Sequence, residues 1–333
     1  MKKSFNRIPI FFLILFSGIA LLEILARQIY LPHSDMFLKQ KSFAQNSSQI
    51  KTLIMGHSHL EKGLDPYYFS SPAFNLAYSA EDIYYHEKVL KKIIDKIPNA
   101  ETLIIGLDYF CFGYDQSKTS LYYVKDYLVN YHIFPEKGFS YALLLNSSVF
   151  WLNRGEILRD FSKLSFRKKG FSYQDSALKT IYKQDTQILI RSGFRYATGH
   201  PSHSELREDA YQTVKRNIYL YDTSIEKKQF KRLQRLINLF LNNSKGEVII
   251  LFAPLSKDYH RIIPEYYKTR SKGFVENLQK SNPKIRFYDF SDLYQDESSF
   301  FLNADHLNAL GAKHFSQYLD SVLTHKPDTC RHN

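Results

Sequence analysis

Residues 51–59 read KTLIMGHSH, and this stretch decides how the rest of the chain is interpreted. Its first five residues form a short apolar and β-branched run, which predicts a strand buried on both faces. Gly56 lets the backbone turn sharply after the strand, and Ser58 follows. A serine on a tight turn from a strand into a helix presents its hydroxyl beyond the sheet, although a serine that only caps a helix has the same pattern. The stretch therefore places Ser58 at the edge of a predicted sheet.

Further apolar runs predict the other strands of this sheet, and helical spacing separates them. The strands are expected at residues 73–77, 102–107, 247–253 and 285–288, and helices at residues 81–97, 230–241 and 309–324. Continuous apolar strands that alternate with helices are typical of a parallel sheet covered on both faces. We expect a three-layer α/β/α fold with about five mostly parallel strands, whose ligand site lies beyond the carboxyl ends of the strands.

The N-terminal segment is predicted to be a membrane anchor. Residues 8–22 are nearly all apolar, and counting to Ala26 gives a helix of about 28 Å, close to the thickness of the hydrocarbon core. Lys2, Lys3 and Arg7 precede it, which predicts a cytoplasmic N-terminus and a translocated body. A cleaved signal peptide and a buried core helix are the alternatives. The expected location is a single pass through the bacterial inner membrane, with the body in the periplasm or outside the cell.

The remaining chain is divided by composition. After the anchor at 1–30, residues 31–50 are polar and are predicted to be a stalk, residues 51–325 form the α/β body, and residues 326–333 form a tail. Within the body, residues 112–222 break the strand–helix alternation and are rich in Tyr, Phe, Lys and Arg, so we expect a largely helical insertion. Its aromatic side chains can serve either as core or as a sugar-stacking surface.

The net charge of +12 limits the classes of partner. A basic balance suits nucleic acid, anionic lipid or an acidic glycan, or it only solvates the surface. No helix-turn-helix, zinc-finger or RNP pattern is visible, so we expect no nucleic acid. The expected partners are the membrane, an anionic glycan or polymer, and a membrane protein that donates an acyl group.

A second motif lies near the C-terminus. Residues 303–308 read NADHLN and precede the last predicted helix. A loop histidine at this place, His306, can act as general base toward a serine at the end of the first strand. The alternative is a surface histidine beside a helix cap.

Together the motifs resemble those of the SGNH (GDSL-like) hydrolases and acyltransferases, in particular their membrane-anchored cell-envelope members. The similar blocks are residues 55–59 (MGHSH), 63–66 (GLDP), 74–77 (FNLA), 229–254 and 305–312 (DHLNALGA). The resemblance covers roughly residues 51–110 and 229–320 and leaves the insertion out.

The resemblance implies a flavodoxin-like fold and acyl-ester chemistry without a cofactor. Ser58 would be the nucleophile and His306 the base, with Asn303 and Asp305 as candidates to orient the His306 ring. Gly56, His57, Asn75 and Ala77 would line the oxyanion hole or bind substrate, although the Asn75 side chain can equally well only tie its loop.

This chain departs from the family pattern at several positions. His57 stands where the family has Asp, Asp108 stands near the place of a third-block Asn, and Asn303 stands where an Asp usually precedes the His. Asp305 directly precedes His306, and adjacent side chains often point apart.

These departures leave the function open between two main hypotheses. The first is an extracytoplasmic esterase or acyltransferase that acts on a cell-envelope glycan or related polymer. The second is a catalytically degenerate accessory protein of an envelope polymer synthesis complex. A third is a metallophosphoesterase built on His57, His59 and His306. We expect no metal, because no further spaced ligand supports one.

Overall fold

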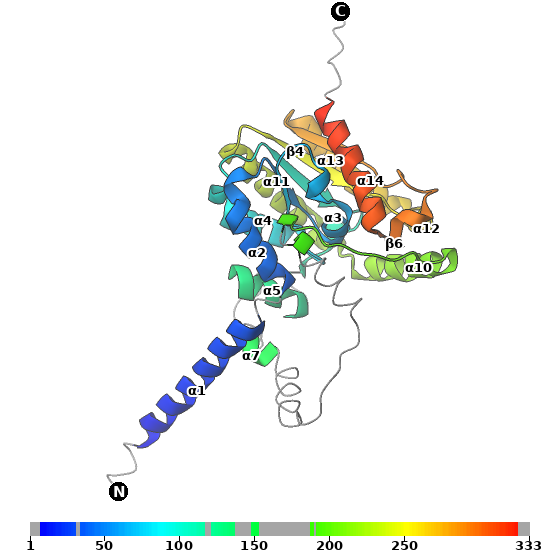
Figure 1. The fold of residues 1–333 in the computed structure, drawn as a ribbon. Coiled ribbons are helices and arrows are strands. Elements are labelled where there is room, and N and C mark those ends of the chain that lie inside the picture. Colours follow the sequence, from blue (N-terminus) through cyan, green and yellow to red (C-terminus); the bar gives the residue numbers. More distant parts are fainter. Residues whose placement is uncertain are drawn as a thin grey trace, which may run out of the picture.

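The computed structural model describes residues 7–30, 34–116, 121–136, 148–152, 187–189 and 191–325 (Figure 1). Its centre is a five-stranded sheet with the order β2-β1-β3-β4-β5, in which every neighbouring pair is parallel. This is the flavodoxin-like order. The strands are β1 (Thr52–Met55), β2 (Ala73–Asn75), β3 (Thr102–Leu107), β4 (Glu247–Phe252) and β5 (Ile285–Asp289). Each lies within a residue or two of a predicted strand, so the predicted fold class is confirmed.

The central strands are buried because their alternate side chains enter two separate cores. On β1, Leu53 and Met55 belong to one core and Ile54 to the other. The first core is covered by α4 (Ile83–Ile93), α11 (Glu226–Asn243) and α13 (Glu265–Ser281). The second is covered by α3 (Ser58–Gly63) and α14 (Ala309–Thr324). The result is three layers with the sheet in the middle.

The predicted stalk is wrong for most of its length. Residues 35–46 form helix α2 (Asp35–Asn46), whose Met36, Lys39 and Phe43 side chains are buried against the body. The spacing of these residues is helical, but the segment is polar overall and one member of its buried face is a lysine. The polar average composition of the segment therefore gave no indication that one face of it packs as a helix.

The described part of the insertion combines helices with loops, among them residues 194–202. It contains α5 (Leu121–Tyr131), α7 (Val149–Leu152) and α10 (His203–Leu220), while residues 117–120, 137–147, 153–186 and 190 lie outside the described residues, as does the predicted tail at 326–333. Helix α10 packs against the short α12 (Lys257–Ile262).

At the N-terminus, α1 (Arg7–Tyr30) projects away from the body (Figure 1). Its stretch Pro9–Ile29 is long and apolar enough to be a membrane span or a signal sequence.

A small hairpin follows the sheet and was not predicted. β6 (Phe301–Asn303) and β7 (His306–Leu307) pair antiparallel just before α14. The β7 strand contacts α3, so the hairpin brings the C-terminal motif against the helix that begins at Ser58.

Two glycines allow α3 to sit close to the sheet. Gly56 has a positive φ of 156°, and a Cβ there would lie 3.2 Å from the backbone of Gly106. A Cβ on Gly106 would lie 2.2 Å from Cγ of Leu60 in α3. Any side chain at position 106 would therefore push α3 away from β3.

We expect Gly106→Ala to lower the free energy of unfolding by about 1–3 kcal/mol, because the added methyl group overpacks the Leu60 contact. Gly273→Ala is the matched control: it lies inside α13 with nothing within 4 Å of the added Cβ, and should stabilise by up to about 1 kcal/mol. Urea unfolding of the two variants measures both effects. Equal stabilities would contradict the proposed close approach.

Candidate active site

The structure brings Ser58 and His306 together, although 248 positions separate them in the sequence. Ser58 is the first residue of α3, directly beyond the carboxyl end of β1, and His306 lies on β7. The Ser58 Oγ lies 2.7 Å from His306 Nε2. This is hydrogen-bond distance for a hydroxyl and the base that receives its proton.

The other ring nitrogen of His306 faces two oxygens. Its Nδ1 lies 2.7 Å from Asp305 Oδ1 and 2.9 Å from Asn303 Oδ1. Asn303 Oδ1 also accepts the backbone N–H of His306 at 3.0 Å, which fixes the turn of the hairpin. Asp305 therefore turns toward the neighbouring ring, so the tendency of adjacent side chains to point apart does not apply here.

The electrostatics of this pair prepare His306 to act as a base. Burial alone would raise the pKa of Asp305, but the His306 charge and hydrogen bonds from His306 and His59 lower it well below its usual range. Burial lowers the pKa of His306, against the opposing effect of Asp305. At neutral pH the carboxylate is charged and the imidazole neutral, so Nδ1 carries the proton that Asp305 and Asn303 accept. The Nε2 lone pair then faces the Ser58 hydroxyl.

Asn75 and Ala77 do not face the reacting groups, which corrects their predicted role at the oxyanion hole. The Asn75 side chain is fully buried and donates to the carbonyls of Leu60 and Leu64 at 2.7 and 2.8 Å. Its oxygen accepts the backbone N–H of Ala77 at 2.9 Å. Asn75 thus ties the loop after β2 to α3, which is one of the two roles predicted for it. The Ala77 amide is already bonded to the Asn75 side chain.

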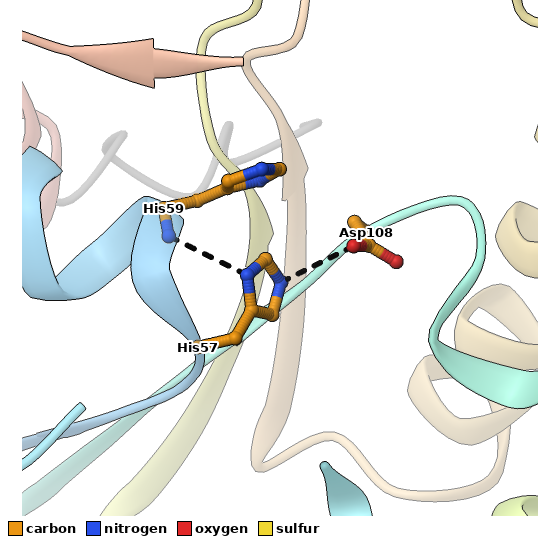
Figure 2. Close-up of side chains that lie close together, drawn as sticks. All are labelled: His57, His59 and Asp108. Carbon is orange, nitrogen blue, oxygen red and sulfur yellow. Dashed lines mark hydrogen bonds and ion pairs between the residues drawn. The ribbon is translucent and has the colours of Figure 1, made fainter. Parts of the chain in front are cut away.

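Gly56 and His57 stay at the site. The Gly56 carbonyl accepts the N–H of Tyr78 at 3.0 Å, which ties the turn after β1 to the loop after β2. The His57 ring lies between the backbone amide of His59 and the carboxylate of Asp108 (Figure 2). His57 Nδ1 accepts the His59 N–H at 3.4 Å, while Nε2 lies 3.6 Å from Asp108 Oδ2.

The tautomer of His57 follows from these contacts. A ring nitrogen that accepts a hydrogen bond carries no proton, so in the neutral ring the proton lies on Nε2. This Nε2 atom is buried and makes no hydrogen bond with the described residues. Burial and the neighbouring His59 lower the pKa of His57 to about 4, so the ring is neutral at pH 7.

A cavity of about 300 Å³ opens from Ser58, His57 and His306. Its wall is formed by the end of β3, the start of α4 and the insertion helix α10, with both apolar and polar side chains. Among them are Leu107, Phe110, Glu81, His86, Asp108 and Arg216. A mixed cavity next to a serine and a base is the form that substrate sites usually take.

Four residues at or behind this site were missed or given no role from the sequence. Glu81, His86 and Asp108 line the cavity. Lys39 lies outside the cavity lining, next to Glu61 of α3. Lys39 Nζ bonds to the Ala77 carbonyl and lies 3.4 Å from Glu61 Oε1, while Ser79 donates to the other oxygen of Glu61. Helical spacing in residues 81–97 was visible, but no local pattern shows that the buried face of this helix also borders a cavity.

Two groups of side chains place possible metal ligands close together. The ligand atoms of His57, His59 and Asp108 lie within 4.8 Å of one another, and so do those of His59, Asp305 and His306. In the second group the atoms already bond to each other, and in the first the His57 Nε2 proton points toward Asp108. A cation in either place would have to displace these hydrogen bonds or that proton.

The chain was compared with family models, curated proteins and solved structures. No family model and no curated protein matches the chain. Among solved structures, one described as "a putative platelet activating factor from Streptococcus pneumonia" is similar with a TM-score of 0.34 and 11% identity, over 90% of this chain and 97% of that chain. A likeness of this size supports no conclusion about activity.

The buried histidines predict how stability depends on pH. Burial, with a smaller contribution from His57, lowers the pKa of His86 from 6.5 to about 3. Below pH 6.5 the unfolded chain therefore binds a proton that the folded chain refuses, and the free energy of unfolding falls as the pH falls. For this one residue the slope is about 1.4 kcal/mol per pH unit between roughly pH 5.5 and 4.

We expect His86→Leu to reduce the slope of stability against pH by about that amount. Urea titrations in detergent between pH 7 and 4 measure it, with the exposed His203→Leu as a control that keeps the wild-type slope. An unchanged slope in His86→Leu would show that His86 is protonated within the folded protein.

Proposed function

We propose that this chain is an SGNH-type serine esterase or O-acyltransferase. The observation that carries the proposal is the 2.7 Å contact between Ser58 Oγ and His306 Nε2, with Asp305 and Asn303 holding Nδ1 on the far side of the ring. Nucleophile, base and orienting group thus stand in the order that acyl transfer requires.

The first half of the proposed reaction acylates the enzyme. Ser58 Oγ attacks the carbonyl carbon of an ester while its proton moves to His306 Nε2. The negative charge that forms on the carbonyl oxygen needs donors, and the Ser58 backbone N–H, which makes no hydrogen bond with the described residues, is one of them. The intermediate then collapses, the alcohol leaves with the proton from His306, and the acyl group stays on Ser58.

The second half returns the enzyme to its starting state. A hydroxyl group of an acceptor, or water, gives its proton to His306 and attacks the acyl carbon. Ser58 leaves and takes the proton back. Asp305 stays charged throughout and stabilises the imidazolium that forms in each half.

His57 supplies the second oxyanion donor in this proposal. The family-like third-block amide is absent, and an aspartate at position 108 would repel a developing negative charge. The neutral His57 ring lines the cavity, and its buried Nε2–H, which points toward Asp108 in this structure, would turn to the carbonyl oxygen when an ester binds. Neutral imidazole is a suitable electrophile, since it polarises a carbonyl without adding a full charge.

The proposed setting is the outer side of the bacterial inner membrane, with α1 as an uncleaved anchor. A domain held there meets glycans as they are assembled, and the net charge of +12 favours an anionic polymer as acceptor. A membrane protein that delivers the acyl group fits this arrangement.

A catalytically silent accessory role is the second candidate, because Asp108 stands where the resemblance leads one to expect an amide donor. The two candidates differ in one cellular test. Ser58→Ala at normal protein level leaves the phenotype intact if the fold serves only as a binding module, and reproduces the loss of the whole protein if Ser58 carries the reaction.

We expect a fluorophosphonate to label the purified full-length protein at Ser58, because His306 activates that hydroxyl. Intact-mass and peptide spectrometry detect the adduct. Ser58→Ala should lose the label completely, and His306→Gln should slow labelling by about 10²-fold or more. An unlabelled wild type, under conditions that label a control esterase, would remove the enzymatic proposal.

We expect His57→Ala to slow acylation of Ser58 by about 10²–10³-fold with little change in KM, because an oxyanion donor acts mainly in the transition state. The burst phase with p-nitrophenyl acetate measures acylation directly. His203→Ala, on an exposed residue, is the matched control. A normal burst in His57→Ala would assign His57 to structure alone.

A further inference from the structure

Helix α1 carries a charged residue inside its apolar stretch. Glu23 lies six positions before the end of Pro9–Ile29, the stretch that is long enough to cross a membrane. The large side chains of Ile19, Leu22 and Leu25 around it are 42–52% exposed. At 1.5 Å per residue, Glu23 would lie about 9 Å inside the body-side end of the span. A carboxylate at that depth requires partners.

Those partners come from α1 itself and from the insertion. Arg27 Nε lies 2.7 Å from Glu23 Oε1, one helical turn further on. Ser148 Oγ donates to Glu23 at 2.7 Å, and the backbone N–H groups of Val149 and Phe150 donate at 3.0 and 3.1 Å. The Glu23 carboxylate therefore accepts hydrogen bonds from two backbone N–H groups at the start of α7. In an apolar medium each group would be costly without the other.

Apolar contacts surround this polar contact. Ala26 of α1, Val149 of α7 and Val129 of α5 form a small buried cluster, against which Phe150 packs. Trp151 points outward and is 40% exposed. An exposed tryptophan next to an apolar helix is typical of the membrane–water interface, where its ring is partly apolar and its N–H meets water or headgroups.

We propose that α7 is a second membrane-contacting element, held at the bilayer interface by its hydrogen bonds to Glu23. The occupant of this surface is the phospholipid bilayer that surrounds α1, because α7 packs directly against the apolar, exposed helix α1 and itself exposes Trp151. The body is thereby attached to the membrane at two points and not by a single flexible helix. The inference rests on the proposed membrane placement of α1 and is independent of catalysis at Ser58.

Trp151 allows a direct test because it is the single tryptophan of the chain. The full-length protein is reconstituted into vesicles of phosphatidylcholine and phosphatidylglycerol at 3:1, with and without bromine at the 6,7 position of the acyl chains. We expect blue-shifted emission and at least a twofold loss of intensity in brominated vesicles. Trp151→Phe supplies the background, and vesicle flotation confirms that each sample is membrane-bound.

Glu23→Ala separates α7 from α1 in this test. We expect the variant to float with the vesicles, since α1 keeps its apolar stretch, but to lose most of the bromine quenching. Emission at the wavelength of fully hydrated tryptophan, without quenching, in a wild-type sample that floats would overturn the proposal. Failure of the wild type to float would show that α1 does not bind the bilayer and would overturn the proposal. Full quenching in Glu23→Ala would show that Glu23 does not hold α7 at the bilayer. Labelling of Ser58 is measured separately, so none of these outcomes is confused with loss of the proposed activity.

Discussion

The parallel direction of all five strands is the constraint on which the site depends. Every strand ends at the same edge, so the turn after β1, the turn after β3 and the hairpin after β5 meet there despite their distance in sequence. The contact between Leu60 and Gly106 sets how closely α3 approaches this edge, and with it the position of Ser58. A shift of α3 by the width of a methyl group would lengthen the 2.7 Å contact between Ser58 Oγ and His306 Nε2 beyond hydrogen-bond distance.

A buried ion pair ties the site to α2, the helix that follows α1. Lys39 of α2 meets Glu61, one turn after Ser58, and also the carbonyl of Ala77. Burial alone would raise the pKa of Glu61, but the Lys39 charge and the Ser79 hydroxyl lower it. Removal of one partner leaves the other charge buried without compensation, which is far more costly than loss of a surface pair. The helix of the serine and the loop beside the cavity are thus fixed by one side chain from α2.

The sequence predicted the architecture well because the strands are continuous apolar runs with clear ends. It predicted the pair Ser58 and His306 through motifs that follow strand ends, and the structure brings these two together. The sequence could not show that Asp305 turns toward the His306 ring, because this orientation depends on the hairpin. It also could not decide that Asn75 ties a loop, because the carbonyl that accepts its hydrogen bond belongs to α3. Such contacts depend on the three-dimensional arrangement of the segments, and no sequence motif indicates them.

Helix α2 also sets the N-terminal boundary of the folded body, because its side chains are buried against that body. A fragment that starts at residue 51, where the motifs begin, would lack Lys39, whose ammonium group is the buried ion-pair partner of the enclosed Glu61 carboxylate. A fragment that starts just before Ser34, the residue that caps α2, keeps this ion pair and removes α1 together with its contacts to α7. A truncation that keeps the body intact therefore belongs between Tyr30 and Ser34, and a protease that trims α2 would remove the support of Glu61 and Ala77 without cutting near Ser58.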